Sequence, residues 1–263
     1  DSVECRPVSA GGVDAEWIVP ADAPDDKAIL YFHGGGFRIG SVASHRELIA
    51  QIADASGCRV LAINYRLSPE HRFPAALDDG LAAYRYLLDQ GIRPESVVFA
   101  GDSAGGNLAL ATMLALRAGG EPLPAAGVLM SPWTDLAATG ASYESRAEAD
   151  PIHQRAMILA LARNYLGEAG DPTDPLASPL YADLAGLPPL LIQAGDRETV
   201  LDDSTMLAAA ARAAGVDVRF EVWDNMIHVF QMFPEIPQAG EAIASLAKFL
   251  QQHLHIRPDG APQ

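Results

Sequence analysis

Cysteine is scarce in this sequence, with only Cys5 and Cys58 among 263 residues. Two cysteines cannot build a disulfide framework, and neither belongs to a Cys-x-x-Cys pair. Asn-x-Ser/Thr glycosylation sites are absent as well. These absences favour a reducing, cytoplasmic setting over a secreted one.

Long hydrophobic runs are also missing, because no apolar stretch approaches the ~18 residues that a membrane span requires. The first residues, DSVECRPVSAGG, lack the basic and apolar segments of a secretory signal. Positive charge is low: 18 Lys and Arg face 34 Asp and Glu, for a formal net charge of −16. Since no basic patch is visible, we expect no nucleic-acid partner and no stable membrane association.

Metal-binding patterns are absent too: the sequence has no His-Glu-x-x-His and no close spacing of His, Cys and carboxylates. Nor does the sequence contain the Lys and Ser/Thr of a phosphate-binding P-loop. We therefore expect a protein that works without a metal ion or an organic cofactor.

Short apolar runs alternate with helical patterns along most of the chain. The runs read as buried strands bounded by glycine, proline or polar residues, at residues 27–32, 59–65, 96–101, 126–131 and 189–195. Apolar residues at three- and four-residue steps predict the helices between them, including 103–118, 203–214 and 239–254. This alternation predicts an α/β protein with a mainly parallel sheet covered by helices on both faces.

Three regions depart from that rhythm, within a chain that we expect to form one domain over residues 1–263. VDAEWIV (13–19) alternates strictly and predicts an antiparallel edge strand. Residues 133–188 are rich in proline and small residues around one helix near 154–166, which is typical of a lid or pocket wall. The tail from about residue 257 is expected to be disordered.

GDSAGG (101–106) follows one of these strands and opens a helix, with Ser103 at its centre. Gly-x-Ser-x-Gly at a strand-to-helix turn is typical of a nucleophilic serine, which the sharp turn lifts toward solvent. The glycines allow neighbouring backbone to approach without a Cβ clash. An ordinary glycine-rich turn is the alternative, but the strand–turn–helix context favours the nucleophile.

YFHGGGF (31–37) places three glycines directly after another strand. A dinucleotide-binding loop needs Gly-x-Gly-x-x-Gly, and the spacing of Gly34, Gly36 and Gly40 is one residue too long. A serine that attacks a carbonyl creates an oxyanion, which needs fixed backbone N–H donors where the charge develops. We expect those donors at Gly35, Gly36 and Ala104.

A nucleophilic serine also needs a base and an acid that orients it. His228 follows the late strand VRFEVW, whereas His33 is expected to support the glycine turn and His45 to cap or precede a helix. The acid is left open between Asp196 and Glu198 in QAGDRETVLDDS, because Asp202 and Asp203 are expected to cap the next helix. The order serine, acid, histidine is that of the nucleophile-elbow hydrolases.

The motifs HGGGF, NYRLSPEHRFPAALDD, GDSAGGNLAL, SPWTDL and WDNMIHVFQMF together resemble the bacterial hormone-sensitive lipase family of α/β-hydrolases. The resemblance spans residues 31–233 and implies an eight-stranded fold and serine-carboxylesterase chemistry. It implies Glu198 as the triad acid, in a departure from the family's usual Asp. It also implies pocket residues, for which the candidates are Trp133, Ile152, His153 and Val229.

The resemblance further implies substrates with short to medium acyl chains, and a homodimer paired through an edge strand and the last helix. A lactone hydrolase with the same triad is the nearest alternative, and a non-catalytic small-molecule binder is a more remote one. The family carries a longer helical segment before its glycine loop, whereas 32 residues precede His33 here. Either the chain is trimmed or its pocket is more open.

Overall fold

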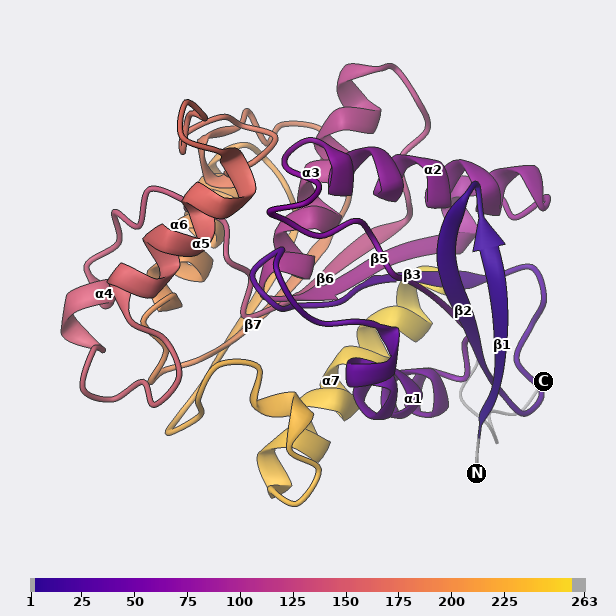
Figure 1. Ribbon diagram of the computed structural model, residues 1–263. Coiled ribbons are helices and arrows are strands. Elements are labelled where there is room, and N and C mark those ends of the chain that lie inside the picture. The colour runs from indigo at the N-terminus through magenta and orange to yellow at the C-terminus, as the bar shows by residue number, and fades with distance from the viewer. Residues whose placement is uncertain (1–2, 257–263) are drawn as a thin grey trace.

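A mostly parallel sheet of eight strands forms the centre of the computed structural model, which describes residues 3–256 (Figure 1). The strand order across the sheet is β1-β2-β4-β3-β5-β6-β7-β8. The strands are β1 (Val3–Ala10), β2 (Val13–Pro20), β3 (Ala28–Phe32), β4 (Val60–Ile63), β5 (Val97–Asp102), β6 (Ala126–Met130), β7 (Leu190–Gly195) and β8 (Val218–Trp223). The prediction of a mainly parallel α/β sheet is confirmed.

The antiparallel edge holds one strand more than the sequence predicts. β2 pairs antiparallel with β4, as expected for residues 13–19, but β1 pairs antiparallel with β2 and forms the outer edge. Most side chains of β1 are exposed, so the strand lacks the buried alternation that reveals β2. Its place in the sheet depends on backbone pairing, which the sequence pattern does not display.

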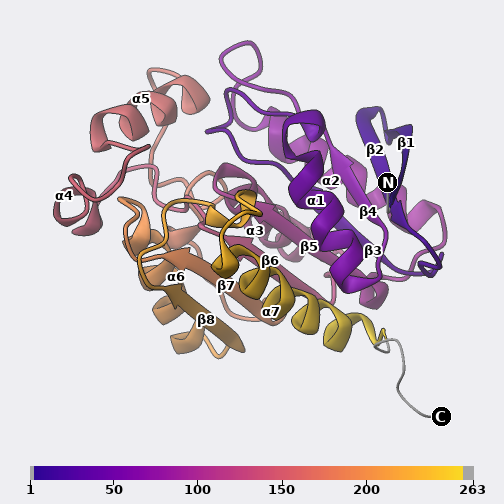
Figure 2. The same ribbon diagram turned by 90° about the horizontal axis from the view of Figure 1, so that it is seen from below.

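Helices cover both faces of the sheet (Figures 1 and 2). α1 (Val42–Ser56) and α7 (Pro237–Leu254) lie side by side and bury their apolar faces on one side. α2 (Ala75–Asp89), α3 (Ala104–Ala118) and α6 (Leu201–Ala213) pack on the other side. The sheet core between these two layers is therefore closed from water on both faces, which holds the carboxyl ends of the strands rigidly.

The chain between β6 and β7 carries two helices, α4 (Ser142–Ser145) and α5 (Arg155–Leu166), and the 3₁₀ turn η2 (Pro179–Tyr181). Further 3₁₀ turns are η1 (Pro94–Ser96) and η3 (Phe230–Met232). α5 matches the one helix predicted there. Figure 2 shows that α4 and α5 lie outside the two helical layers, beyond the carboxyl ends of the parallel strands. The tail predicted to be disordered lies outside the described residues.

Candidate active site

Ser103 stands on a sharp turn between β5 and α3, with φ 53° and ψ −120°. A non-glycine residue in this region of backbone space is strained, so the packing around it must hold it there. The glycine at position 105 makes the turn possible, because a Cβ on it would lie 1.9 Å from the carbonyl oxygen of Phe32. The backbone N–H of Ser103 donates to Met130 O at 2.9 Å, which fixes the turn against β6.

The glycine loop follows β3 and lies over this turn. Tyr65 donates from its hydroxyl to the carbonyl oxygen of His33 at 2.6 Å, and the two rings stack with centroids 4.3 Å apart. The Nδ1 atom of His33 is 2.7 Å from Gly34 O. Burial lowers the pKa of His33 to about 4, so its ring is neutral at pH 7. His33 therefore packs within the glycine turn, which is where the sequence predicts that it lends support.

Gly35 and Gly36 of this loop adopt positive φ angles and also pack closely against neighbouring atoms. Gly35 has φ +121°, and a Cβ on it would lie 2.1 Å from Ile39 O, so no other residue fits. Gly36 has φ +63° and faces Leu161 of α5. The sequence interpretation assigned the glycines to substrate approach alone. The structure adds that the tight packing of the loop itself requires them.

His228 and Glu198 meet across two loops at the carboxyl ends of β8 and β7. The Nδ1 atom of His228 is 2.7 Å from Oε2 of Glu198. Glu198 is fully buried, and its second oxygen, Oε1, accepts hydrogen bonds from Ser131 Oγ and the backbone N–H of Gly195. A buried carboxylate with this many donors is well suited to hold an imidazole in one orientation.

Asp196, the other acid left open by the sequence, has no hydrogen bond to His228 among the described residues, and its Oδ1 is buried without a partner. Its backbone N–H donates to Trp223 O at 3.1 Å, which ties the loop to the end of β8. The geometry therefore brings Glu198 to His228, and leaves Asp196 beside the pair as part of the loop.

Ser131, at the end of β6, is a site residue that the sequence analysis missed. Its hydroxyl donates to Glu198 Oε1 at 2.7 Å and accepts the backbone N–H of Val229 at 3.0 Å. One side chain thus connects the acid with the loop that carries His228. The available signal was its position at the carboxyl end of a predicted strand, where α/β proteins place functional groups.

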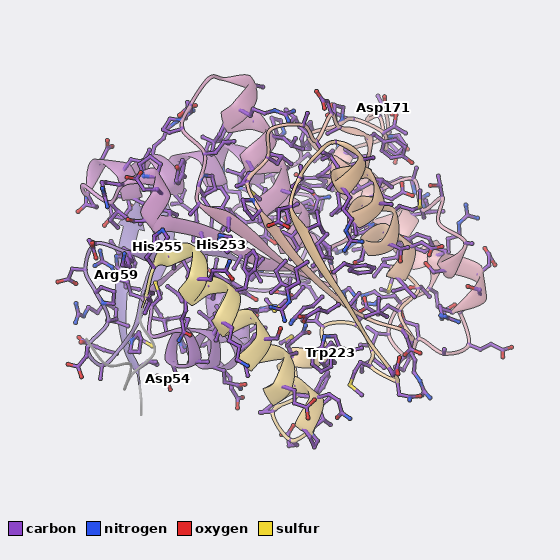
Figure 3. The ribbon with its side chains drawn as sticks, turned by 180° about the vertical axis from the view of Figure 1, so that it is seen from behind. Asp54, Arg59, Asp171, Trp223, His253 and His255 are labelled. Carbon is purple, nitrogen blue, oxygen red and sulfur yellow. The ribbon has the colours of Figure 1, made fainter. Side chains whose placement is uncertain are left out.

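A cavity of about 710 Å³ opens beside Ser103 and is also lined by Gly35, Gly36 and His228. The four residues named as pocket candidates all line it, namely Trp133, Ile152, His153 and Val229. α5 contributes a largely apolar wall that includes Met157, Ile158 and Leu161. By contrast, His253 and His255 lie at the C-terminal end of α7 (Figure 3) and do not line this cavity.

His153 packs the edge of its ring against that of His228, with centroids 4.3 Å apart. Burial and the neighbouring His228 lower the pKa of His153 to about 3, so it is neutral at pH 7. Asp150 holds the start of this loop by accepting the backbone N–H groups of Ile152 and His153. Its other oxygen accepts from the backbone N–H of Thr199, next to Glu198, at 2.8 Å. The pocket wall and the acid loop are therefore joined.

The prediction that Asp202 or Asp203 caps α6 is wrong, since α6 has Val200 at its N-cap position and no side-chain cap. Asp203 is buried and accepts the backbone N–H of Asp135 at 2.8 Å and the Tyr143 hydroxyl at 2.9 Å. Asp202 accepts the backbone N–H of Ser142 at 2.8 Å. Both side chains therefore form hydrogen bonds with distant loop residues instead of with the first backbone N–H groups of α6.

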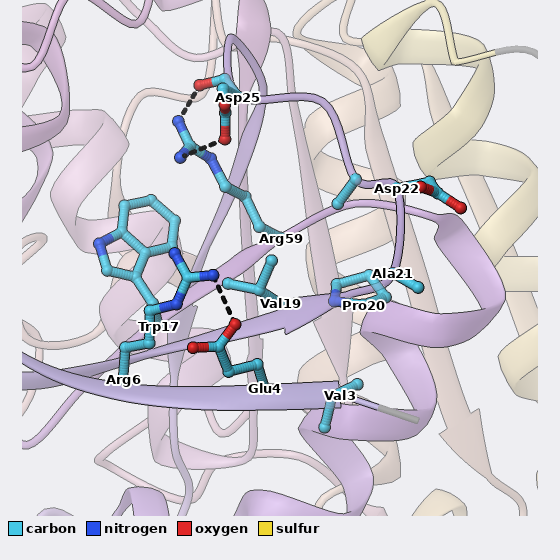
Figure 4. Close-up of a pocket in the computed structure, with 11 residues that line it drawn as sticks. Val3, Glu4, Arg6, Trp17, Val19, Pro20, Ala21, Asp22, Asp25 and Arg59 are labelled. Atoms are coloured by element: carbon cyan, nitrogen blue, oxygen red, sulfur yellow. Dashed lines mark hydrogen bonds and ion pairs between the residues drawn. The ribbon is translucent and has the colours of Figure 1, made fainter. Parts of the chain in front are cut away.

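A second cavity, of about 580 Å³, lies against β1 and β2 and shares no residue with the first (Figure 4). Four of its charged groups are paired, Arg6 with Glu4 and Arg59 with Asp25, and Asp22 also lines it. The guanidinium of Arg59 lies 4.6 Å from the centre of the Trp17 ring. No nucleophile with an adjacent base lies among its lining residues. The candidate catalytic residues therefore all belong to the cavity beside Ser103.

Within residues 3–256, no group of three or more His, Cys, Asp or Glu side chains is placed to hold a metal ion. A search of the same residues for a helix long and apolar enough to cross a membrane finds none.

Comparison with known proteins places this geometry in a family. A family model described as the α/β hydrolase fold matches residues 29–232. A protein named acetyl-hydrolase from Streptomyces hygroscopicus is 47% identical over 245 residues, covering 93% of this chain and 81% of the relative. An esterase from Acinetobacter venetianus is 39% identical over 249 residues, covering 94% of this chain and 82% of the relative.

Among solved structures, an esterase from the bacterial hormone-sensitive lipase family superposes with a TM-score of 0.95 at 50% identity. The match covers 97% of this chain and 86% of that one. The chain therefore belongs to the α/β-hydrolase fold family and, within it, to the bacterial hormone-sensitive lipase family.

Proposed function

We propose that this protein hydrolyses short- to medium-chain carboxylic esters, with Ser103 as nucleophile, His228 as base and Glu198 as the acid that orients it. One observation carries the proposal: the 2.7 Å contact between His228 Nδ1 and Glu198 in a cavity that Ser103 also lines. The Nε2 atom of His228 is buried and has no hydrogen-bond partner among the described residues, so no other group competes for the proton that we assign to it. Relatives named esterase and acetyl-hydrolase support the reaction class.

In the proposed reaction, His228 takes the proton of Ser103 Oγ while that oxygen attacks the ester carbonyl carbon. The carbonyl oxygen becomes an oxyanion and accepts hydrogen bonds from the backbone N–H groups of Gly35, Gly36 and Ala104. His228 then protonates the departing alcohol, which leaves an acyl group on Ser103. A water molecule, deprotonated by His228, attacks this acyl group and releases the carboxylic acid.

The substrate range follows from the cavity wall. Met157, Ile158 and Leu161 offer apolar surface for an acyl chain within a volume of about 710 Å³, which suits a small ester rather than a bulky lipid. Residues 133–188 act as the lid or pocket wall in this proposal, because α5 lies between β6 and β7 and lines the cavity.

The proposal is tested by steady-state hydrolysis of p-nitrophenyl esters from C2 to C12, with Ser103→Ala as the control. Activity that peaks between C2 and C8 and disappears in the variant supports it. A matched lactone and open-chain ester of equal carbon number are compared in the same assay. Turnover of the lactone alone would reassign the substrate class, and no turnover by the folded protein would make the cavity a binding site.

We also propose that two copies pair through β8 and α7. β8 is the edge strand of the sheet and is joined to α7 by hydrogen bonds from Ser245 to Glu221 and from Arg219 to Ser245. Val222 of this strand is exposed, although it is apolar. Sedimentation velocity at micromolar concentration is expected to show a dimer, and a monomer would exclude it.

A further inference from the structure

Asp102, the residue before Ser103, is buried beneath the glycine loop, where only 2% of its surface is exposed. Its Oδ1 accepts the Tyr31 hydroxyl at 2.6 Å and the backbone N–H of Gly34 at 3.1 Å. Its Oδ2 lies 3.3 Å from Nε2 of His45, in the first turn of α1. His45 therefore neither caps nor precedes the helix, as its sequence position suggested. Ser41 is the cap, and His45 faces the carboxylate.

Both ring nitrogens of His45 face hydrogen-bond acceptors. Nε2 faces the carboxylate of Asp102, which only accepts when ionised. Nδ1 is 3.2 Å from the carbonyl oxygen of Ser41 and 2.9 Å from Ser44 Oγ. The carbonyl oxygen of Ser41 can only accept, and the Ser44 hydroxyl accepts as well when its own hydrogen points to Ser41 O. An imidazole that donates from both nitrogens is an imidazolium.

The charges around His45 agree with this assignment. Burial by itself lowers the pKa of His45, but the hydrogen bond and negative charge of Asp102 outweigh it, and the pKa is raised. His33, whose ring centre is 5.5 Å away, is neutral because burial lowers its pKa to about 4. Burial and the charge of nearby Asp102 raise the pKa values of Tyr31 and Tyr65. Arg38 and His228 line the cavity that His45 also lines.

The glycine loop rests directly on this carboxylate. A Cβ at Gly34 would lie 2.1 Å from Asp102 Oδ2, so only glycine lets the backbone come this close. Gly34 immediately precedes Gly35 and Gly36, whose N–H groups we assign to the oxyanion. Any rotation of the Asp102 carboxylate would therefore move those donors relative to Ser103, and a misplacement of about 1 Å can cost about 100-fold in rate.

We propose that His45, as an imidazolium, and Asp102 form a positioning pair that holds the glycine loop in register with Ser103. The inference rests on the proposed function for its effect on rate. His45 touches no reacting atom in this account and acts through Asp102. The site then contains two imidazole–carboxylate pairs: His228 with Glu198 moves protons, and His45 with Asp102 keeps its proton throughout the cycle.

The first test compares the pH dependence of kcat and KM in the native protein, in His45→Gln and in His71→Gln, which changes an exposed histidine. The native kcat is expected to fall about tenfold or more in a one-proton step above neutral pH, with little change in KM. His45→Gln is expected to have a low kcat without that step, and His71→Gln to follow the native profile. A native profile in His45→Gln would overturn the proposal.

The second test needs no substrate. Protein labelled with ¹⁵N and ¹³C in histidine is titrated by NMR, natively and as Asp102→Asn. The midpoint of His45 is expected above the ordinary value of about 6.5 in the native protein and below it in Asp102→Asn. A native midpoint below 6.5 would overturn the proposal even if His45→Gln failed to fold. An inactive protein with a raised His45 midpoint would instead count against the ester-hydrolase proposal alone.

Discussion

The Nδ1 atom of His228 lies 2.7 Å from Oε2 of Glu198, although 29 residues separate the two in the chain and each sits on its own loop. The loops are brought together because β7 and β8 are parallel neighbours, so their carboxyl ends meet at one edge of the sheet. Glu198 is fully buried, and its charge is held by three donors rather than by water.

Glu198→Gln is therefore expected to lower kcat by about 10⁴-fold, because the amide no longer stabilises a cationic His228 or selects its tautomer. Asp196→Asn is the matched control, since it makes the same chemical change two residues away without touching His228. Steady-state kinetics on p-nitrophenyl butyrate measures both. Equal losses, or a larger loss in Asp196→Asn, would move the acid to Asp196.

Ser131→Ala is expected to reduce kcat by about tenfold to a hundredfold, with KM nearly unchanged. The change removes a hydrogen bond to a buried charge, worth about 1.5–3 kcal/mol, and leaves the backbone N–H of Val229 without its acceptor. Ser131→Cys, which keeps a weak donor of similar shape, should recover part of the rate. An unchanged kcat in Ser131→Ala would show that Glu198 is held well enough by its other partners.

Leu161→Ala is expected to shift preference toward longer acyl chains, because Leu161 lines the cavity and packs beside the glycine at position 36. Removing its side-chain carbons makes room for two or three methylenes, each worth about 0.8 kcal/mol on burial. The ratio of kcat/KM for the C8 ester to that for C4 should rise about tenfold or more. Leu159→Ala, on the same helix but outside the cavity lining, should leave the ratio unchanged.

The free energy of unfolding is expected to fall as pH drops from 7 to 5. Burial lowers the pKa of His33 to about 4 and that of His153 to about 3, whereas both titrate near 6.5 when unfolded. At pH 5 these two histidines are therefore protonated in the unfolded chain but mostly neutral in the folded chain. This difference lowers the free energy of unfolding by up to about 2 kcal/mol per histidine. The raised pKa of His45 gives a stabilisation that is fully present below pH 6.5 and is lost as pH rises above it, so it does not oppose this trend.

Urea denaturation at pH 7, 6 and 5 measures this effect in the native protein and in His153→Gln. The variant should lose about 2 kcal/mol less between pH 7 and 5, because glutamine does not titrate. Identical pH dependence in the two proteins would mean that folding does not lower the pKa of His153.

The sequence predicted the central strands and the main helices well, because those strands are short, mostly apolar and bounded by turn residues. It could not predict β1, whose residues are mostly exposed and do not alternate between buried and exposed positions. Ser103 and the glycine loop were recognisable because the chemistry of each requires special backbone, which leaves glycine in the sequence.

The rest of the site depends on contacts between distant segments, which no local pattern encodes. Asp196 and Glu198 look alike in sequence, and only the path of the loop after β7 distinguishes them. His45 meets Asp102 because α1 packs beneath the loop that follows β3, and Ser131 meets Glu198 because β6 and β7 are neighbours. Such pairings are set by tertiary packing.

The central claim is that Ser103 is a nucleophile activated by His228, and covalent trapping tests it most directly. The native protein, Ser103→Ala and His228→Gln are each treated with diethyl p-nitrophenyl phosphate and measured by intact and peptide mass spectrometry. The account predicts one phosphoryl group per native chain, on the peptide that contains Ser103, with none on Ser103→Ala and far slower labelling of His228→Gln. Labelling of Ser103→Ala at the native rate, or no labelling of the folded native protein, would contradict it.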